Sequence, residues 1–183
     1  MHAIKRVCSA ILLSGAALVA QAGDASHPSA PLVLVDGSAH FGATFAAGNM
    51  GNNFSDHFSF DTTGVNGIDA LVSSISRTAV TGLDITGFAL YGSSGLIASG
   101  NQLGTGAIDL WSLSVNNLGP GSYYVQVTGH LVSSTAASYG ANINLTPVPE
   151  PTTYVLLLCG LGLLGALAIR HFPCPRRALG TAL

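Results

Sequence analysis

Before residue 148, the residues whose types could most readily support catalysis or ligand binding lie at 54–58, which read FSDHF. Aspartate, histidine and serine are the members of a hydrolase triad, and serine is abundant in this chain. However, no Gly-x-Ser-x-Gly turn places a serine between a strand and a helix. No glutamate precedes Glu150, and nothing marks two aspartates as the paired carboxylates of a glycosidase. We therefore assign no catalytic residues and expect a protein that is not an enzyme.

Asp56 is the residue of this segment whose carboxylate needs a partner. It shares its strand parity with three aromatic residues, Phe54, Phe58 and Phe60. A carboxylate on an aromatic face is costly unless it is paired or hydrogen-bonded. Three arrangements would satisfy Asp56: backbone N–H groups of a neighbouring loop, a Ca²⁺ ion shared with Asp61 or Asp69, or an exposed strand end. Arg77 is a further candidate partner, because it is the only Lys or Arg between 23 and 148.

Charge and cysteine content exclude several classes of partner and cofactor. Segment 23–148 carries one arginine and seven aspartates, a net charge of −6, so it cannot neutralise phosphates and we exclude nucleic acid. The three cysteines lie outside this segment, which therefore has no disulfide and no cysteine metal site. Its histidines show no metal-ligand spacing, so no cofactor or metal site is expected beyond the Ca²⁺ alternative.

Alternating apolar residues define the elements that must position these side chains. Clusters of Gly, Pro and Asn separate short alternating segments, and long helical faces are absent. We predict an all-β, jelly-roll-like antiparallel β-sandwich over 32–146, preceded by a flexible Pro- and Ser-rich leader over 23–31. About eight strands are expected: 32–36, 40–45, 54–61, 68–75 (a strand or a short helical crossover), 83–91, 107–115, 123–131 and 139–145. The Gly-Pro-Gly turn at 119–121 predicts a hairpin between 107–115 and 123–131.

Exposed aromatic residues would support a second function, as a carbohydrate-binding or adhesive module. Trp111 and Tyr124 lie on outward strand parities, and Tyr91 is a further candidate for a flat glycan platform. The alternative for Trp111 is a core or edge aromatic residue.

The C-terminal segment contains a short motif, an apolar stretch and a basic tail. Val148, Pro149, Glu150 and Pro151 precede an uncharged segment, 152–169, whose 18 residues would make a helix of roughly 27 Å. This length is slightly short of a hydrocarbon core of about 30 Å. We predict a single transmembrane helix here, with a buried core helix as the alternative. The basic tail, 170–183, carries three residues that would stay in the cytoplasm: Arg170, Arg176 and Arg177.

The N-terminal segment has the pattern of a secretory signal peptide. Two basic residues precede an apolar stretch, 7–19, which is too short for a membrane anchor. Ala20 and Ala22 form a small-x-small site, so we predict cleavage by signal peptidase before Gly23 and export through the general secretion machinery.

The C-terminal pattern resembles the PEP-CTERM sorting signal of Gram-negative bacteria that produce exopolysaccharide. The resemblance implies that exosortase, a membrane protease with a cysteine nucleophile, cuts near Pro149–Pro151. The precursor would then lie in the inner membrane with its domain outside the cytoplasm, and the mature form at the cell surface or in the extracellular matrix. In this chain, five residues separate Arg170 from Arg176, whereas the family's basic cluster usually abuts the helix.

A second resemblance covers the domain itself. Phe54, Asp56 and Phe58, the segment 123–129 (YYVQVTG) and the segment 138–142 (SYGAN) resemble the FxDxF family of PEP-CTERM proteins. That family implies a non-enzymatic surface or matrix protein associated with exopolysaccharide or biofilm.

Overall fold

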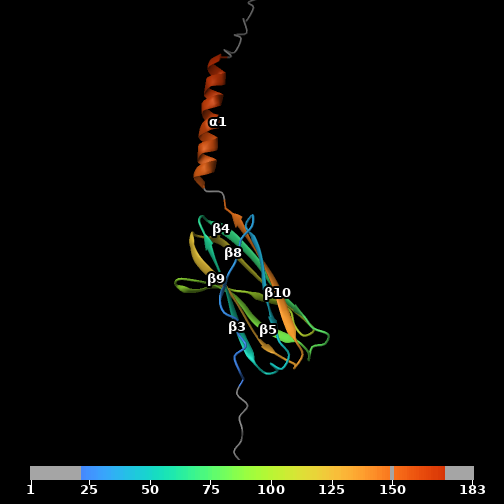
Figure 1. Ribbon diagram of the computed structural model, residues 1–183. Helices are drawn as coiled ribbons and strands as arrows, with labels where there is room; N and C mark the ends of the chain where they lie inside the picture. The colour runs from blue at the N-terminus through green and yellow to red at the C-terminus, as the bar shows by residue number, and fades with distance from the viewer. Residues whose placement is uncertain (1–21, 149–150, 172–183) are drawn as a thin grey trace, which may run out of the picture.

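The computed structural model describes residues 22–148 and 151–171 of the chain. Two five-stranded sheets pack face to face, and one helix, α1 (Pro151–His171), follows them (Figure 1). Sheet A has the spatial order β1 (Ala30–Pro31), β3 (Asn53–Thr62), β9 (Gly121–Leu131), β5 (Leu83–Gly92) and β6 (Gly95–Ser99). Sheet B has the order β2 (Ser38–Phe45), β10 (Ala137–Pro147), β4 (Asn66–Ile75), β8 (Ile108–Leu118) and β7 (Asn101–Gly104). The predicted β-sandwich is confirmed.

The strands pair in a nested order. β2 pairs with β10, β3 with β9, β4 with β8, and β5 with β6, each time antiparallel. β1 is the exception, because it pairs with β3 in parallel. This winding, in which early strands pair with late ones, resembles that of a jelly roll.

The structure resolves one open prediction and changes three others. The segment 68–75 is a strand, whereas 32–36 forms no strand: Leu32 donates its N–H to the Ser59 carbonyl at 2.7 Å, and Val35 forms an isolated bridge with Ser38. β6 and β7 were not predicted, because their short segments lie between clusters of glycine that indicate turns. The predicted hairpin at 119–121 is wrong, since β8 belongs to sheet B and β9 to sheet A. Both strands bury apolar residues in the same core, Leu113 from one side and Val125 from the other, so the turn crosses between the sheets.

The leader over 23–31 is not free, contrary to expectation. The backbone N–H of Ala25 donates to the Asn53 carbonyl at 2.8 Å, and the Ser55 N–H donates to the Ser26 hydroxyl at 2.8 Å. Ala30 then begins the parallel pairing with β3. The leader is therefore held along the edge of sheet A by hydrogen bonds that its polar composition did not reveal.

The described side chains of α1 lie outside the core. The buried hydrophobic residues of the described chain fall between Ala39 and Ile143, while Leu156 and Leu158 of α1 are 79% and 68% exposed. A buried core helix, the alternative for this segment, is therefore wrong. In residues 22–148 and 151–171, no helix combines the length and apolar character that crossing a membrane requires. The predicted transmembrane helix over 152–169 is thus not confirmed, although a helix forms there.

Candidate functional site

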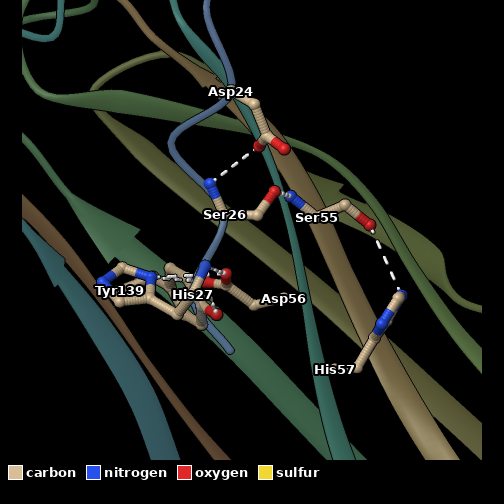
Figure 2. Close-up of polar contacts among 7 residues, drawn as sticks. All are labelled: Asp24, Ser26, His27, Ser55, Asp56, His57 and Tyr139. Carbon is tan, nitrogen blue, oxygen red and sulfur yellow. Dashed lines mark hydrogen bonds and ion pairs between the residues drawn. The ribbon is translucent and has the colours of Figure 1, made fainter. Parts of the chain in front are cut away.

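The Asp56 carboxylate lies between the two sheets and is held by three groups (Figure 2). Its side chain is 1% exposed. The His27 backbone N–H donates to Oδ1 at 2.6 Å, and the Tyr139 hydroxyl donates to Oδ2 at 2.6 Å. The His27 Nδ1 lies 3.3 Å from both carboxylate oxygens. Of the three arrangements considered for Asp56, the structure shows the one with a backbone N–H donor, which comes from the leader.

The three segments that carry the family resemblance meet around Asp56. Phe54 of β3 pairs with Gly129 of β9, and its ring stacks on Tyr139 of β10 with centroids 5.7 Å apart. Gly129 leaves the room that the Phe54 ring occupies, because a Cβ atom at Gly129 would overlap both that ring and the Asp84 carbonyl. Phe58 pairs with Val125 on the same two strands. These three sequence patterns therefore describe one packed unit.

Tyr139 serves as a neutral donor to Asp56. Burial, together with the hydrogen bond to the Asp56 carboxylate and its charge, raises the pKa of Tyr139 well above the usual 10.0. A phenol with a raised pKa keeps its proton at neutral pH, so the short bond to Asp56 persists.

The triad that the segment 54–58 allows on paper does not form. The Ser55 hydroxyl and the His57 Nε2 are 3.5 Å apart on the outer face of sheet A, while the Asp56 carboxylate points to the opposite, inner face. The Asp56 carboxylate is enclosed and takes its hydrogen bonds from other elements. The three side chains therefore do not form a triad.

The other candidate partners of Asp56 lie elsewhere. Asp61 accepts a hydrogen bond from the Ser122 hydroxyl at 2.6 Å on the outer parity of β3, and Asp69 points outward from sheet B. Within the described residues, no three His, Cys, Asp or Glu side chains gather where a metal ion could be held. Arg77 follows β4 and makes no ion pair with Asp56, whose oxygens are bonded as above. The structure therefore does not bring together the residues of the Ca²⁺ alternative.

Asp109 is a second buried carboxylate, which the sequence analysis missed. Its side chain is 1% exposed and accepts hydrogen bonds at 3.2 Å from the Ser74 hydroxyl, the Ile85 N–H and the Gly106 N–H. Asp109 shares its strand parity with the apolar residue Leu113, as Asp56 does with Phe54 and Phe58. The same alternation rule could therefore have predicted that Asp109 is buried.

Aromatic side chains form a row on the outer face of sheet A. Tyr91 and Tyr124, paired across β5 and β9, stack with centroids 5.0 Å apart and an interplanar angle of 3°. His57 of β3 meets Tyr124 edge-on at 5.1 Å. Trp111 is not part of this row: it is half-buried in sheet B, packs against the core and donates its Nε1–H to the Ile85 carbonyl at 3.0 Å. The outward parity assigned to Trp111 is therefore wrong, because it shares the inward parity of Leu113.

The predicted processing residues lie at the limits of the described domain. Val148 donates its N–H to the Val65 carbonyl at 2.9 Å, Pro151 begins α1, and Arg170 falls near the end of α1. At the other limit, Gly23 follows Ala22 and donates its N–H to Asn52 Oδ1 at 3.0 Å. The remaining predicted residues lie outside the described ranges: Ala20, Pro149, Glu150, Arg176 and Arg177.

The molecule is thus a β-sandwich followed by a C-terminal segment whose described side chains are not part of the core. Residues 147–177 of this segment match the PEP-CTERM protein-sorting motif, so the chain carries the sorting signal that its sequence resembled. A search among curated proteins finds no match to this sequence.

Two solved structures match this chain at low sequence identity and with TM-scores below 0.5. One is the pre-peptidase C-terminal domain of a collagenase from Bacillus anthracis, with 15% identity, a TM-score of 0.39, and coverage of 64% of this chain and 95% of that one. Another is PliG of Aeromonas hydrophila, a periplasmic inhibitor of g-type lysozyme, with 12% identity, a TM-score of 0.44, and coverage of 68% and 100%.

Replacing Asp56 with alanine should destabilise the domain by about 1–3 kcal/mol, because the Tyr139 hydroxyl and the His27 N–H lose their acceptor. Asp61→Ala is the matched control on the same strand, and its exposed position predicts a change within about 0.5 kcal/mol. Urea unfolding of both variants measures the difference. Equal stability of Asp56→Ala and the parent chain would show that these hydrogen bonds contribute nothing.

The raised pKa of Tyr139 predicts a loss of stability in alkaline solution. Well below pH 10.0, the usual pKa of the phenol, Tyr139 is protonated in both the folded and unfolded chains. Above that pH the unfolded chain releases the proton and the folded chain keeps it, so stability falls by up to about 1.4 kcal/mol per pH unit. Unfolding curves measured from neutral pH to above pH 10.0 should show this fall in the free energy of unfolding with pH, and Tyr139→Phe should make the fall less steep. An unchanged slope in Tyr139→Phe would assign the effect to another group.

Proposed function

We propose that the protein is a non-enzymatic module that exosortase delivers to the cell surface or extracellular matrix, where it associates with exopolysaccharide or biofilm. The observation that carries this proposal is the match to the sorting motif, which begins at Pro147, the last residue of β10. The signal therefore starts where the fold ends.

The limits of the fold support removal of both terminal segments. The buried hydrophobic residues of the described chain end at Ile143, and the described leucines of α1 are exposed, so cutting after β10 would remove nothing from this core. At the other end, a cut before Gly23 by signal peptidase would leave the leader bonded along β3. In this proposal the leucine-rich tail holds the precursor at the inner membrane, with the sandwich outside the cytoplasm and the arginines inside.

Replacing Pro149, Glu150 and Pro151 together with alanine should abolish processing, because exosortase loses the motif next to which it cuts. The expected result is a full-length form retained in the membrane fraction and a loss of the surface form, as in a strain without exosortase. Thr152→Ala with Thr153→Ala, a change in the same tail outside the motif, should leave processing intact. Fractionation and mass measurement of the surface C-terminus read out the result. Identical surface forms with and without exosortase would contradict the proposal.

A carbohydrate-binding or adhesive role is the second candidate, and the aromatic row on sheet A favours it. Tyr91, Tyr124 and His57 present ring surface beside the polar side chains of Ser55 and Gln126, and such mixtures suit sugar rings with their C–H faces and hydroxyls.

Removing Tyr124, the central ring of that row, should therefore weaken glycan retention. Tyr124→Ala should lower binding to responsive sugars on a glycan array about tenfold, since a stacked aromatic contact contributes on the order of 1 kcal/mol or more. Ser114→Ala, at an exposed position of sheet B, should have no effect. An array without any binding, or equal binding by Tyr124→Ala, would remove this candidate.

A further inference from the structure

A hollow lies at the end of the sandwich far from the sorting signal. It is an open pocket of about 610 Å³, formed by the end of β2, the segment after β4 and the start of β10. β10 starts at this pocket and ends at Pro147, where the signal begins. Its 11 residues separate the two features by roughly 35 Å. A precursor held by its tail would therefore present this pocket outward.

Arg77 gives this pocket its charge. It is the only Lys or Arg between 23 and 148, its side chain is exposed, and it lines the pocket, whereas no Asp or Glu does so. Among the described residues, Arg77 forms no ion pair. A guanidinium that is free in this way can offer its planar fork of N–H groups to an incoming oxyanion.

Five residues that carry hydroxyl groups line the same pocket as Arg77: Thr44, Ser76, Thr81, Thr135 and Ser138. Within the described part of the chain, the hydroxyls of Thr44, Ser76 and Ser138 have no hydrogen-bond partner. Two hydrogen bonds join the segment before β5 to the segment after β9. The Gly82 N–H donates to the Ser133 hydroxyl and the Val132 N–H donates to the Gly82 carbonyl, both at 3.0 Å. The pocket therefore holds free donors and acceptors on a fixed frame.

The carboxylates on the flanking strands are already engaged. Asp84 lies next to the lining residue Leu83, but its Oδ2 is 3.4 Å from the His130 Nε2 on the outer face of sheet A. Asp109 is buried behind the end of β4 and accepts three hydrogen bonds there. Neither lines the pocket or neutralises Arg77.

We call the trough the strip of the outer face of sheet B that runs along β10 from this pocket to a second hollow. Ser138 lines the first pocket, and Gly140 and Asn142, the next outward residues of β10, line a second hollow of about 380 Å³ together with His40 and Ser73. Gly140 pairs across the strands with Gly42; a Cβ at Gly140 would meet no atom within 4 Å, whereas one at Gly42 would overlap the Tyr139 carbonyl. Glycine in a strand interior marks a place where another backbone, as at Gly42, or a ligand, as the open space at Gly140 allows, can approach closely. From Ser138 to Asn142 the trough runs for roughly 14 Å.

We infer that this trough binds an acidic oligosaccharide, with one carboxylate of the sugar chain on the Arg77 guanidinium and the following units along β10 past Gly140. Hydroxyls at the Arg77 end and the Asn142 and His40 side chains further along match the hydroxyls of sugars. The exposed apolar side chains of Ile75 and Leu71 lie beside them, where the C–H faces of sugar rings can pack. The site is separate from the aromatic row, which lies on the other sheet, and it specifies the class of polysaccharide for the proposed matrix association.

Calorimetric titration of the intact chain tests this inference with oligomers of galacturonate, mannuronate and glucuronate. At least one should bind, and its methyl ester, which has the same sugars without the charge, should bind at least about tenfold more weakly. Arg77→Gln should cause a similar loss, and Arg77→Lys a smaller one, because lysine keeps the charge but not the fork. Gly140→Val should also weaken binding by filling the trough. Unfolding curves check that each variant folds.

Ser59→Val, at an exposed position on sheet A, is the steric control for Gly140→Val and should bind as the parent chain does. Tyr124→Ala should bind acidic oligomers normally. Failure of all three acidic oligomers to bind, equal binding of the methyl ester, or equal binding by Arg77→Gln would each overturn the inference. Because the titration uses purified chain, its outcome does not depend on exosortase, and a failure of sorting would leave it unaffected.

Discussion

The buried carboxylate of Asp56 is the interaction on which the rest of the domain depends. Asp56 belongs to sheet A and its partner Tyr139 to sheet B, so their 2.6 Å hydrogen bond joins the two layers. Asp109 of sheet B repeats this arrangement through the Ile85 N–H of sheet A. The described domain contains no cysteine and hence no disulfide. Two fully bonded carboxylates supply directional contacts between layers that apolar packing alone would leave free to slide.

These interior groups also limit where function can lie. An enclosed carboxylate with three partners has no room for a substrate, so the interior is structural and the surface must carry any recognition. The winding of the chain distributes the surface features: the sorting signal follows the end of β10, the Arg77 pocket lies at its start, and the aromatic row lies on the other sheet. The end of the sandwich next to Pro147 therefore carries the sorting signal. The opposite end and both outer faces remain accessible to ligands.

Sequence alone predicted what depends on neighbours along the chain and missed what depends on distant pairing. Alternation placed most strands and pointed the Asp56 carboxylate inward, and the same rule applied to Asp109 would have found it. The partner of Asp56 lies 83 residues away, and no periodicity indicates it. The hairpin at 119–121 failed because a Gly-Pro-Gly turn fits a sheet crossing as well as a hairpin. The leader failed because its order comes from hydrogen bonds to β3, which composition does not encode.

A single arginine has a larger effect on anion binding in this acidic segment than it would on a surface with many lysines and arginines. A segment with a net charge of −6 repels polyanions over most of its surface. A single unpaired guanidinium in a hydroxyl-lined hollow then provides attraction at one place only, where the carboxylate and the sugar hydroxyls can be satisfied together. Scattered lysines would attract any anionic polymer, including nucleic acid, without selecting sugars. Concentrating the cationic charge in one pocket makes contact with an acidic polysaccharide local and dependent on shape.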